Sequence, residues 1–201
     1  MNYIRNVFVP AILAGIFISI GGFVNLAVGS YLGAFLFALG LCAVCVFGTP
    51  LFTGKAGFVE MKWNGILFLI VVLFGNILGC YLMSLVGSAS NMNLTEAADK
   101  IVNVRLTNGW LRTGVLSIGC GIIMTVCVKA YLTQKTFIPI LIGIPTFILC
   151  GFPHCVADVF YYFMMSGEMA HNLYPAGISI YAATVVGNFI GCNVPRVLGP
   201  R

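Results

Sequence analysis

Six long apolar runs dominate the hydrophobic pattern of this chain, and most polar residues fall into short segments between them. The runs cover approximately residues 6–28, 32–52, 63–87, 109–131, 136–152 and 172–194. Each is close to the ~20 residues that a helix needs to cross a hydrocarbon core about 30 Å thick. Spanning strands would instead be about ten residues long, with alternating polarity. The pattern therefore predicts an all-α membrane protein with six transmembrane helices.

The composition agrees with this prediction. Hydrophobic residues make up 60% of the 201 residues and charged residues only 7%, whereas soluble domains carry roughly 25% charged residues. A water-soluble fold is therefore excluded. Six spans leave little sequence for anything else, so we expect one transmembrane domain over residues 1–201.

The basic residues are divided unevenly between the segments that connect the runs. With six spans, the termini and the 2–3 and 4–5 connections share one side, which holds Arg5, Lys55, Lys62, Lys129, Lys135, Arg196 and Arg201. The other side holds Lys100, Arg105 and Arg112, partly offset by Glu96, Asp99 and Glu168. Cytoplasmic loops carry the excess of Lys and Arg. We therefore expect a multi-pass protein of the cell (inner) membrane with both termini in the cytoplasm, and we attribute the net charge of +5 to topology rather than to binding of nucleic acid.

Two short motifs each occur twice and indicate an internal duplication. The sequence GNILGC at 75–80 recurs as GNFIGC at 187–192, and FGTPLFT at 47–53 corresponds to CGFPHCV at 150–156. Three spans per half is an odd number, so the second half must begin on the opposite side of the membrane. We therefore expect an inverted repeat. Repeat one covers about 1–87 and repeat two about 106–201, and the polar stretch between them, about 88–105, is expected to be an external loop with a short helix capped by Asn93 or Thr95.

The second pair of motifs interrupts the second and fifth runs with the same Gly-x-Pro spacing, at Pro50 and Pro153. Proline removes a backbone donor and clashes with the preceding turn. Backbone freed in this way is tolerated at membrane depth only where it is buried in protein or lines a cavity. Ordinary proline kinks are the alternative, but interruptions at corresponding positions of two halves indicate a transport site. We therefore expect helices 2 and 5 to be broken and to meet at one pathway.

His154 directly follows the second interruption and is the main candidate for chemistry. An ionisable group deep in a spanning segment is by default a functional hypothesis. Thr53, after the first interruption, could hydrogen-bond His154 if the two breaks meet. Asp158, four residues beyond the histidine, could pair with it or lie toward solvent.

No pattern indicates an enzyme, a cofactor or a metal site. The eight cysteines lie within or at the ends of apolar runs and are expected to be free packing residues. A metal site would need more soft ligands converging on one point. No Gly-rich nucleotide loop or pair of haem ligands is evident.

The interruption motifs resemble those of a known family. GTPLFTG at 48–54 is similar to the G-A-E-L-F-T-G-N motif of the formate/nitrite transporter family, and GFPHCVA at 151–157 is similar to its G-F-E-H-S-x-A-N motif. The two Gly-Asn-x-x-Gly signatures also fit, and the resemblance covers nearly the whole chain. It implies a homopentamer of aquaporin-like protomers in the lipid bilayer, each with its own pore for a small monovalent anion or weak acid.

The resemblance also implies residue roles. His154 is then the central pore histidine and Thr53 its partner. Leu51, Phe52, Phe37 and Leu41 form one hydrophobic constriction and Phe147 the other. The vestibule lysine of the family falls on Arg105, which keeps the positive charge and would attract anions. Asp158 and Asn188 are expected to contact and position these pore residues without lining the pore themselves.

Several positions depart from the family pattern. Pro50 and Pro153 replace glutamates, and Lys55 and Asp158 replace asparagines. Gly121 and Ile180 stand where spans 4 and 6 have asparagine.

The expected function is a channel or transporter for small monovalent anions or their conjugate acids, such as formate, nitrite or hydrosulfide. Transport would be proton-linked through His154. The apolar Ile180 and Gly121 keep open a pore for a small neutral solute such as water, ammonia or urea. A membrane enzyme or a scaffold that transports nothing is disfavoured by the duplicated breaks.

Overall fold

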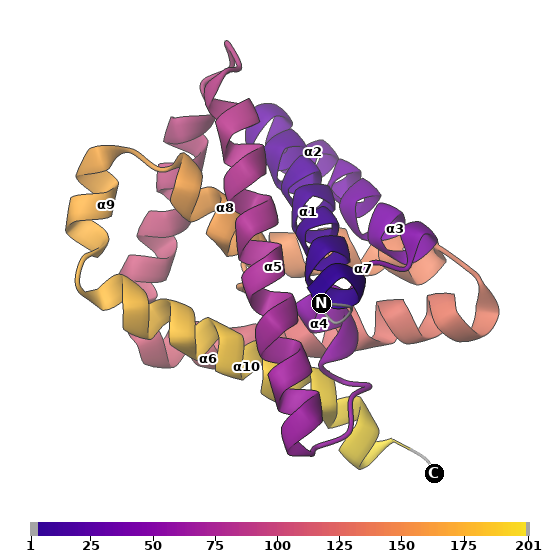
Figure 1. Ribbon diagram of the computed structural model, residues 1–201. Helices are drawn as coiled ribbons and strands as arrows, with labels where there is room; N and C mark the ends of the chain where they lie inside the picture. Colours follow the sequence, from indigo (N-terminus) through magenta and orange to yellow (C-terminus); the bar gives the residue numbers. More distant parts are fainter. Residues whose placement is uncertain (1–3, 200–201) are drawn as a thin grey trace.

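The computed structural model describes residues 4–199, and every regular element within them is helical (Figure 1). In chain order the elements are the π-helix η1 (Ile4–Phe8) and the α-helices α1 (Val9–Val28), α2 (Ser30–Leu36), α3 (Ala38–Phe47), α4 (Phe52–Lys55), α5 (Trp63–Ser88), α6 (Leu94–Gln134), α7 (Ile138–Leu149), α8 (Ala157–Met164), α9 (Gly167–Leu173) and α10 (Ala176–Leu198). Arg201, which contributed to the expected cytoplasmic charge, lies outside the described residues.

Within the described residues, five helical segments are long and apolar enough to cross a membrane. They are Arg5–Val28, Ser30–Phe47, Trp63–Ser88, Leu94–Gln134 and Ala176–Leu198. The chain is therefore an all-helical, multi-pass membrane protein. The apolar run at 136–152, expected to be the fifth of six spans, forms only the twelve-residue helix α7. It is short because Gly151, at φ 68°, and the Pro153 region end the helix.

The helices are interrupted at both predicted places. Helix α3 ends at Phe47, Gly48 has a φ of 65°, and the backbone is extended at Leu51 before α4 begins. Helix α7 ends at Leu149, Gly151 also has a positive φ, and α8 begins only at Ala157. Glycine adopts this left-handed conformation without the penalty that a Cβ brings. In both breaks a left-handed glycine ends the helix before the proline is reached.

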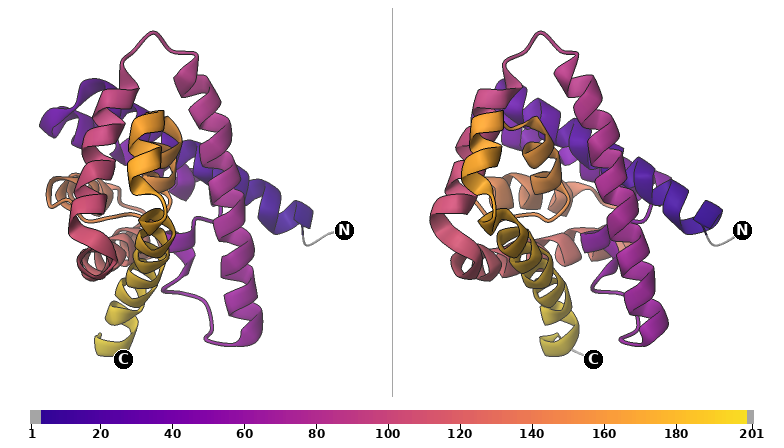
Figure 2. Two further views of the ribbon diagram at one scale, coloured as in Figure 1. Left: turned by 90° about the vertical axis from the view of Figure 1, so that its left-hand side faces the viewer. Right: turned by 60° about the vertical axis from the view of Figure 1, so that its left-hand side comes forward.

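The helix expected within the polar segment 88–105 begins directly after Asn93, one of the two predicted caps, but it is not short, because it continues as α6. Only residues 89–93 lack helical structure, and they join α5 to α6 as an arch that both views in Figure 2 show clearly. Leu94, Ala98 and Val102 are buried at four-residue intervals. This spacing gives the start of α6 one apolar helical face, which packs against α8 and α9. The bend in α6 comes later, at Gly109, whose φ is 65°.

Contacts between distant helices bring the two breaks together. The most extensive contacts join α1 to α5 and α6 to α10, so the long helices pair within each half of the chain. The short helices cross over: α8 packs against α1 and α5, and α4 packs against α6 and α10. Each break is therefore held partly by the opposite half.

Glycines allow these long helices to approach closely. A Cβ built at Gly79 would overlap the carbonyl oxygen of Ile12 in α1. The corresponding Gly191 of α10 has the same relation to the carbonyl of Ile118 in α6. Small residues at such crossings let membrane helices pack backbone against backbone. The second glycine of each Gly-Asn-x-x-Gly signature thus serves helix packing.

We expect Gly79→Val to destabilise the protein by about 1–3 kcal/mol or more, because the overlap is with backbone that cannot rotate away. Thermal unfolding in detergent measures the effect. Gly167→Ala is the control, since no atom lies within 4 Å of a Cβ there. An unchanged melting temperature for Gly79→Val would contradict this packing.

Candidate functional site

Thr53 and His154 meet where the two breaks come together. Thr53 lies in α4 and His154 precedes α8, 101 residues further along the chain. The distance from Thr53 Oγ1 to His154 Nε2 is 2.9 Å. Both side chains are buried, at 0% and 2% exposure. The contact that the sequence suggested therefore exists in the fold.

The backbone around His154 defines the tautomer that fits this contact. The N–H groups of Val156 and Ala157 donate to His154 Nδ1 at 3.3 Å and 3.0 Å. Because Nδ1 accepts these bonds, the neutral ring carries its proton on Nε2 and donates it to Thr53 Oγ1. The Thr53 hydroxyl then keeps its own proton for a further acceptor.

Aromatic rings enclose the histidine on one side. Phe147 stacks on His154 with ring centroids 5.7 Å apart, and Phe37 meets Phe147 edge-on at 6.0 Å. Phe37, which was expected in the constriction with Leu41, Leu51 and Phe52, thus contacts Phe147 of the other expected constriction. Phe37 lies at the junction of α2 and α3, close enough to α7 for the two rings to touch. The remaining expected constriction residues are all buried: Leu41, Leu51 and Phe52.

Asn76 holds the first break in place. Its Oδ1 accepts the N–H of Phe52 at 2.9 Å, and its Nδ2 donates to the carbonyls of Ala11 and Pro50 at 2.8 Å and 3.0 Å. Two backbone groups of the break, the N–H of Phe52 and the carbonyl of Pro50, are thus satisfied by one buried amide that also bonds to α1. Residue-by-residue reasoning did not assign this role to Asn76, although the repeated signature contained the signal.

Asn188 repeats the same pattern at the second break. Its Oδ1 accepts the N–H of Cys155 at 2.8 Å, and its Nδ2 donates to the carbonyls of Ser117 and Pro153 at 2.8 Å and 2.9 Å. Asn188 therefore acts on the backbone on either side of His154 and not on the imidazole.

The cysteines of the two signatures cross to the opposite break. The Cys80 thiol donates to the carbonyl of Val156 at 3.4 Å, and the Cys192 thiol donates to the carbonyl of Thr53 at 3.4 Å. Asparagine thus supports the break of its own half and cysteine the break of the other half. All eight cysteines are free.

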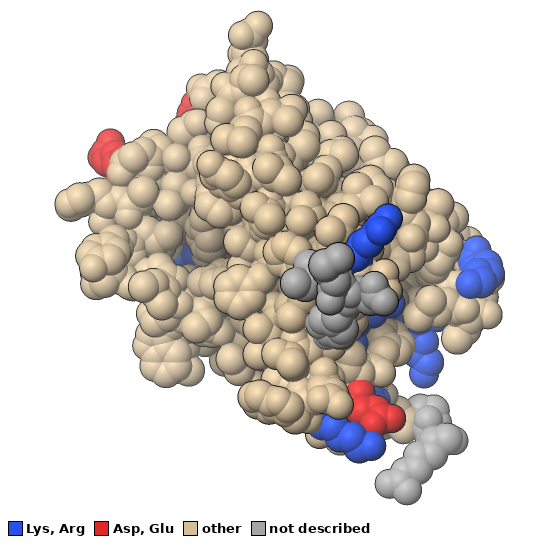
Figure 3. All heavy atoms as spheres, viewed as in Figure 1, with Lys and Arg blue, Asp and Glu red and all other residues tan. Residues whose placement is uncertain are grey.

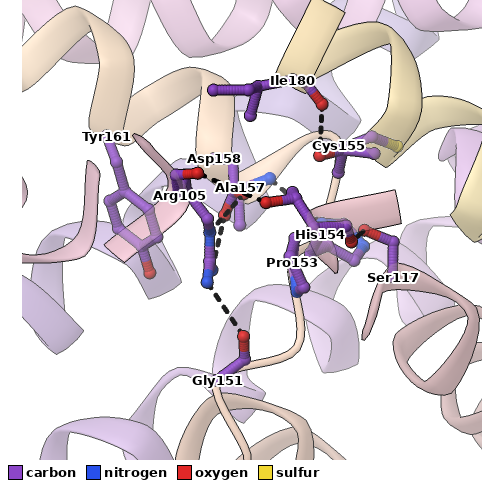
Figure 4. A network of polar contacts seen from close by, with 12 residues as sticks. Arg105, Ser117, Gly151, Pro153, His154, Cys155, Ala157, Asp158, Tyr161 and Ile180 are labelled. Atoms are coloured by element: carbon purple, nitrogen blue, oxygen red, sulfur yellow. Dashed lines mark hydrogen bonds and ion pairs between the residues drawn. The ribbon is translucent and has the colours of Figure 1, made fainter. Parts of the chain in front are cut away.

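Arg105 and Asp158 form a buried ion pair beside the second break (Figure 4). Arg105 donates through Nε to Asp158 Oδ2 at 2.9 Å, through NH2 to Oδ1 at 3.2 Å and through NH1 to the carbonyl of Gly151 at 2.9 Å. The side chains are 7% and 1% exposed. Asp158 therefore neither binds the imidazole nor lies toward solvent, and both expected placements are wrong.

A cavity of about 550 Å³ opens beside this ion pair and Phe147. Arg105 and Asp158 belong to its wall, together with Asn25, Lys100, Phe147, Phe152 and Tyr161. Among residues 4–199, no group of three or more His, Cys, Asp or Glu side chains is placed to hold a metal ion. The cavity instead offers positive charge and aromatic surface, and its wall residue Phe147 is the ring that stacks on His154.

The model of the formate/nitrite transporter family matches residues 2–197. This chain belongs to that family. The expectation from the sequence motifs is confirmed, and membership in a family of transporters agrees with the expectation that the chain is not an enzyme.

The chain shares only a low sequence identity with individual relatives. A formate-nitrite transporter of Entamoeba histolytica is 26% identical over an alignment that covers 94% of this chain and 61% of that protein. The chain thus spans about three fifths of the length of this curated relative.

Two solved structures share the fold. A pentameric formate channel with formate bound has a TM-score of 0.79 and 22% identity, covering 98% of this chain and 96% of that one. A second ion channel of the family has a TM-score of 0.79 and 18% identity, covering 98% and 90%.

We expect Arg105→Gln to cost about 3–5 kcal/mol of stability, because it leaves the Asp158 carboxylate buried without a counter-charge. Asp158→Asn should cost a similar amount, and the double variant should recover part of the loss. Unfolding of the four proteins in detergent gives the coupling energy of a double-mutant cycle. Strictly additive effects would contradict a tight pair.

Proposed function

We propose that this protein is a channel or transporter for small monovalent anions or their conjugate acids, of the formate, nitrite or hydrosulfide type. The observation that carries the proposal is the buried pair of His154 and Thr53, placed where two broken helices meet and enclosed by apolar side chains. The names of the related proteins, which refer to formate and nitrite, support the same class of substrate.

The apolar surroundings favour passage of the neutral acid. Moving a bare ion into a medium of low dielectric has an idealised cost of order 20 kcal/mol. Protonating a carboxylate of pKa about 4 at pH 7 costs only about 4 kcal/mol. A proton taken from bulk water, either directly or relayed through His154 Nε2 with the imidazole reprotonated in the same step so that it stays neutral, therefore offers the easier route. The free hydroxyl proton of Thr53 can donate to the oxygen of the passing solute.

Two groups of apolar side chains constrict the pore, one on each side of the Thr53–His154 pair. We assign one constriction to Phe37 and Phe147, next to the cavity that Arg105 lines, and the other to Leu41, Leu51 and Phe52. Arg105 attracts anions at the first mouth, although Asp158 offsets much of its charge at longer range. Asn188 and Asp158 hold the backbone of the second break.

We further propose that the chain is a single domain of six spans, with α7 and α8 together forming the fifth. The matched bonds of Asn76 and Asn188, and the crossed bonds of Cys80 and Cys192, support two inverted repeats in an aquaporin-like protomer. Assembly as a homopentamer follows by analogy with the related formate channel.

The orientation is also a proposal. On the face drawn in Figure 3, most Lys and Arg side chains gather at the right and lower right, on the side of the C-terminus. By the positive-inside rule this side is cytoplasmic, which would place both termini inside a cell (inner) membrane.

Formate flux into proteoliposomes tests the role of the histidine. We expect the wild-type rate to rise as pH falls, because more substrate is protonated. His154→Asn should lower the rate at neutral pH by about tenfold or more, since positioned proton donors typically contribute ~10²–10⁴-fold. His171→Asn, at an exposed histidine of α9, is the matched control. Flux indifferent to His154 replacement at every pH would contradict the histidine role.

A pore for water, ammonia or urea remains the second candidate. Ile180 is buried at 1% exposure, and Gly121 packs against the backbone of α10, so neither position offers a polar side chain. Stopped-flow permeability separates the two functions: rapid passage of a neutral solute without formate, nitrite or hydrosulfide flux would favour the second.

A further inference from the structure

Two cations lie near the proposed pore, Arg105 on the side of Phe147 and Lys55 on the side of Leu51, and in the part of the chain that the structure describes only one of them is paired with a carboxylate. Arg105 is paired with the buried carboxylate of Asp158. Lys55, at the end of α4, has no carboxylate within salt-bridge distance among residues 4–199. The three ion pairs of that part of the chain use Glu60, Glu96 and Asp158.

Lys55 lines a small cavity on the side of Leu51, away from the Arg105 cavity. The space is about 50 Å³, and its wall includes Thr49, Leu51, Gly54, Lys55, Val128 and Tyr131. One water needs roughly 10–15 Å³ of such space, so an anion of three or four heavy atoms fits and a larger organic anion does not. Leu51, the expected constriction residue, forms part of the same wall.

Thr49 supplies a hydrogen-bond donor without a partner. Its side chain is 6% exposed, and its buried Oγ1 makes no hydrogen bond in the described part of the chain. Buried hydroxyl groups are usually hydrogen-bonded, and each exception calls for an explanation. A ligand that accepts this hydrogen bond provides one.

Thr49 and Lys55 both differ from the residues that the family motif has at these positions. Where the G-A-E-L-F-T-G-N pattern has alanine and asparagine, the chain has Thr49 and Lys55. The two replacements add one hydroxyl donor and one positive charge to the same small cavity.

We propose that Lys55 and Thr49 form a binding subsite for a small monovalent oxyanion at the Leu51 end of the pore. This subsite rests on the proposed anion transport and adds to it a second point of recognition. The ammonium of Lys55 supplies the charge and the Thr49 hydroxyl donates to an anion oxygen. Because no carboxylate neutralises Lys55, this mouth concentrates anions more strongly than the mouth beside the Arg105–Asp158 pair.

Initial rates of formate uptake into proteoliposomes, measured against formate concentration, test the subsite. We expect Lys55→Gln to raise KM roughly tenfold and Thr49→Val roughly threefold, while Lys55→Arg and Thr49→Ser stay near wild type. Lys129→Gln, which removes an exposed lysine outside the cavity wall, should leave KM unchanged. Wild-type KM should also rise with ionic strength more steeply than that of Lys55→Gln.

The outcomes separate the subsite from the function. If the wild type carries anions and both Lys55→Gln and Thr49→Val match Lys129→Gln in KM, the subsite is wrong and the transport function stands. If the wild type carries no anion, the proposed function itself fails. Should Lys55→Gln fail to assemble, Thr49→Val decides alone, because it keeps the size and the charge of the site: an unchanged KM overturns the subsite and a raised KM supports it.

Discussion

The structure depends on the satisfaction of backbone groups at two interrupted helices. Within a bilayer no water replaces a lost helical hydrogen bond, so each break is tolerable only if protein supplies partners. Asn76 and Asn188 do this in the same way: each accepts one bond from the break and donates one to it, and each donates a third bond to a carbonyl of a neighbouring helix. The glycines next to these asparagines let α5 and α10 lie close enough to their neighbours for the short side chains to reach.

This support makes the chemistry at the centre possible. With the breaks fixed, Thr53 and His154 come within 2.9 Å of each other from opposite halves of the chain. The Nδ1 atom is occupied by two backbone N–H groups, so Nε2 is the nitrogen that faces Thr53. A repeat built from equivalent parts thus presents two different groups, a hydroxyl and an imidazole, at one point.

Charge is arranged less symmetrically than the backbone. Asp158, in place of an asparagine, encloses Arg105 in a buried pair that also fixes the carbonyl of Gly151. At the corresponding position of the first motif, Lys55 has no such partner among the described residues. The pore that we propose therefore carries its uncompensated positive charge near Leu51 rather than near Phe147.

The sequence by itself determined the membrane class, the family, the positions of both breaks and the pairing of Thr53 with His154. These follow from long apolar runs, repeated motifs and glycines whose backbone conformation is local. Sequence reasoning underestimated the length of the helix that follows Asn93, because its apolar face becomes evident only when α8 and α9 are there to cover it.

Only the tertiary structure decided the other contacts between parts of the chain that are distant in sequence. It assigned Asp158 to Arg105, Phe37 to Phe147, and the two cysteines to the opposite breaks. These choices depend on how helices cross in space, and a linear pattern does not specify the angle or the depth of a crossing.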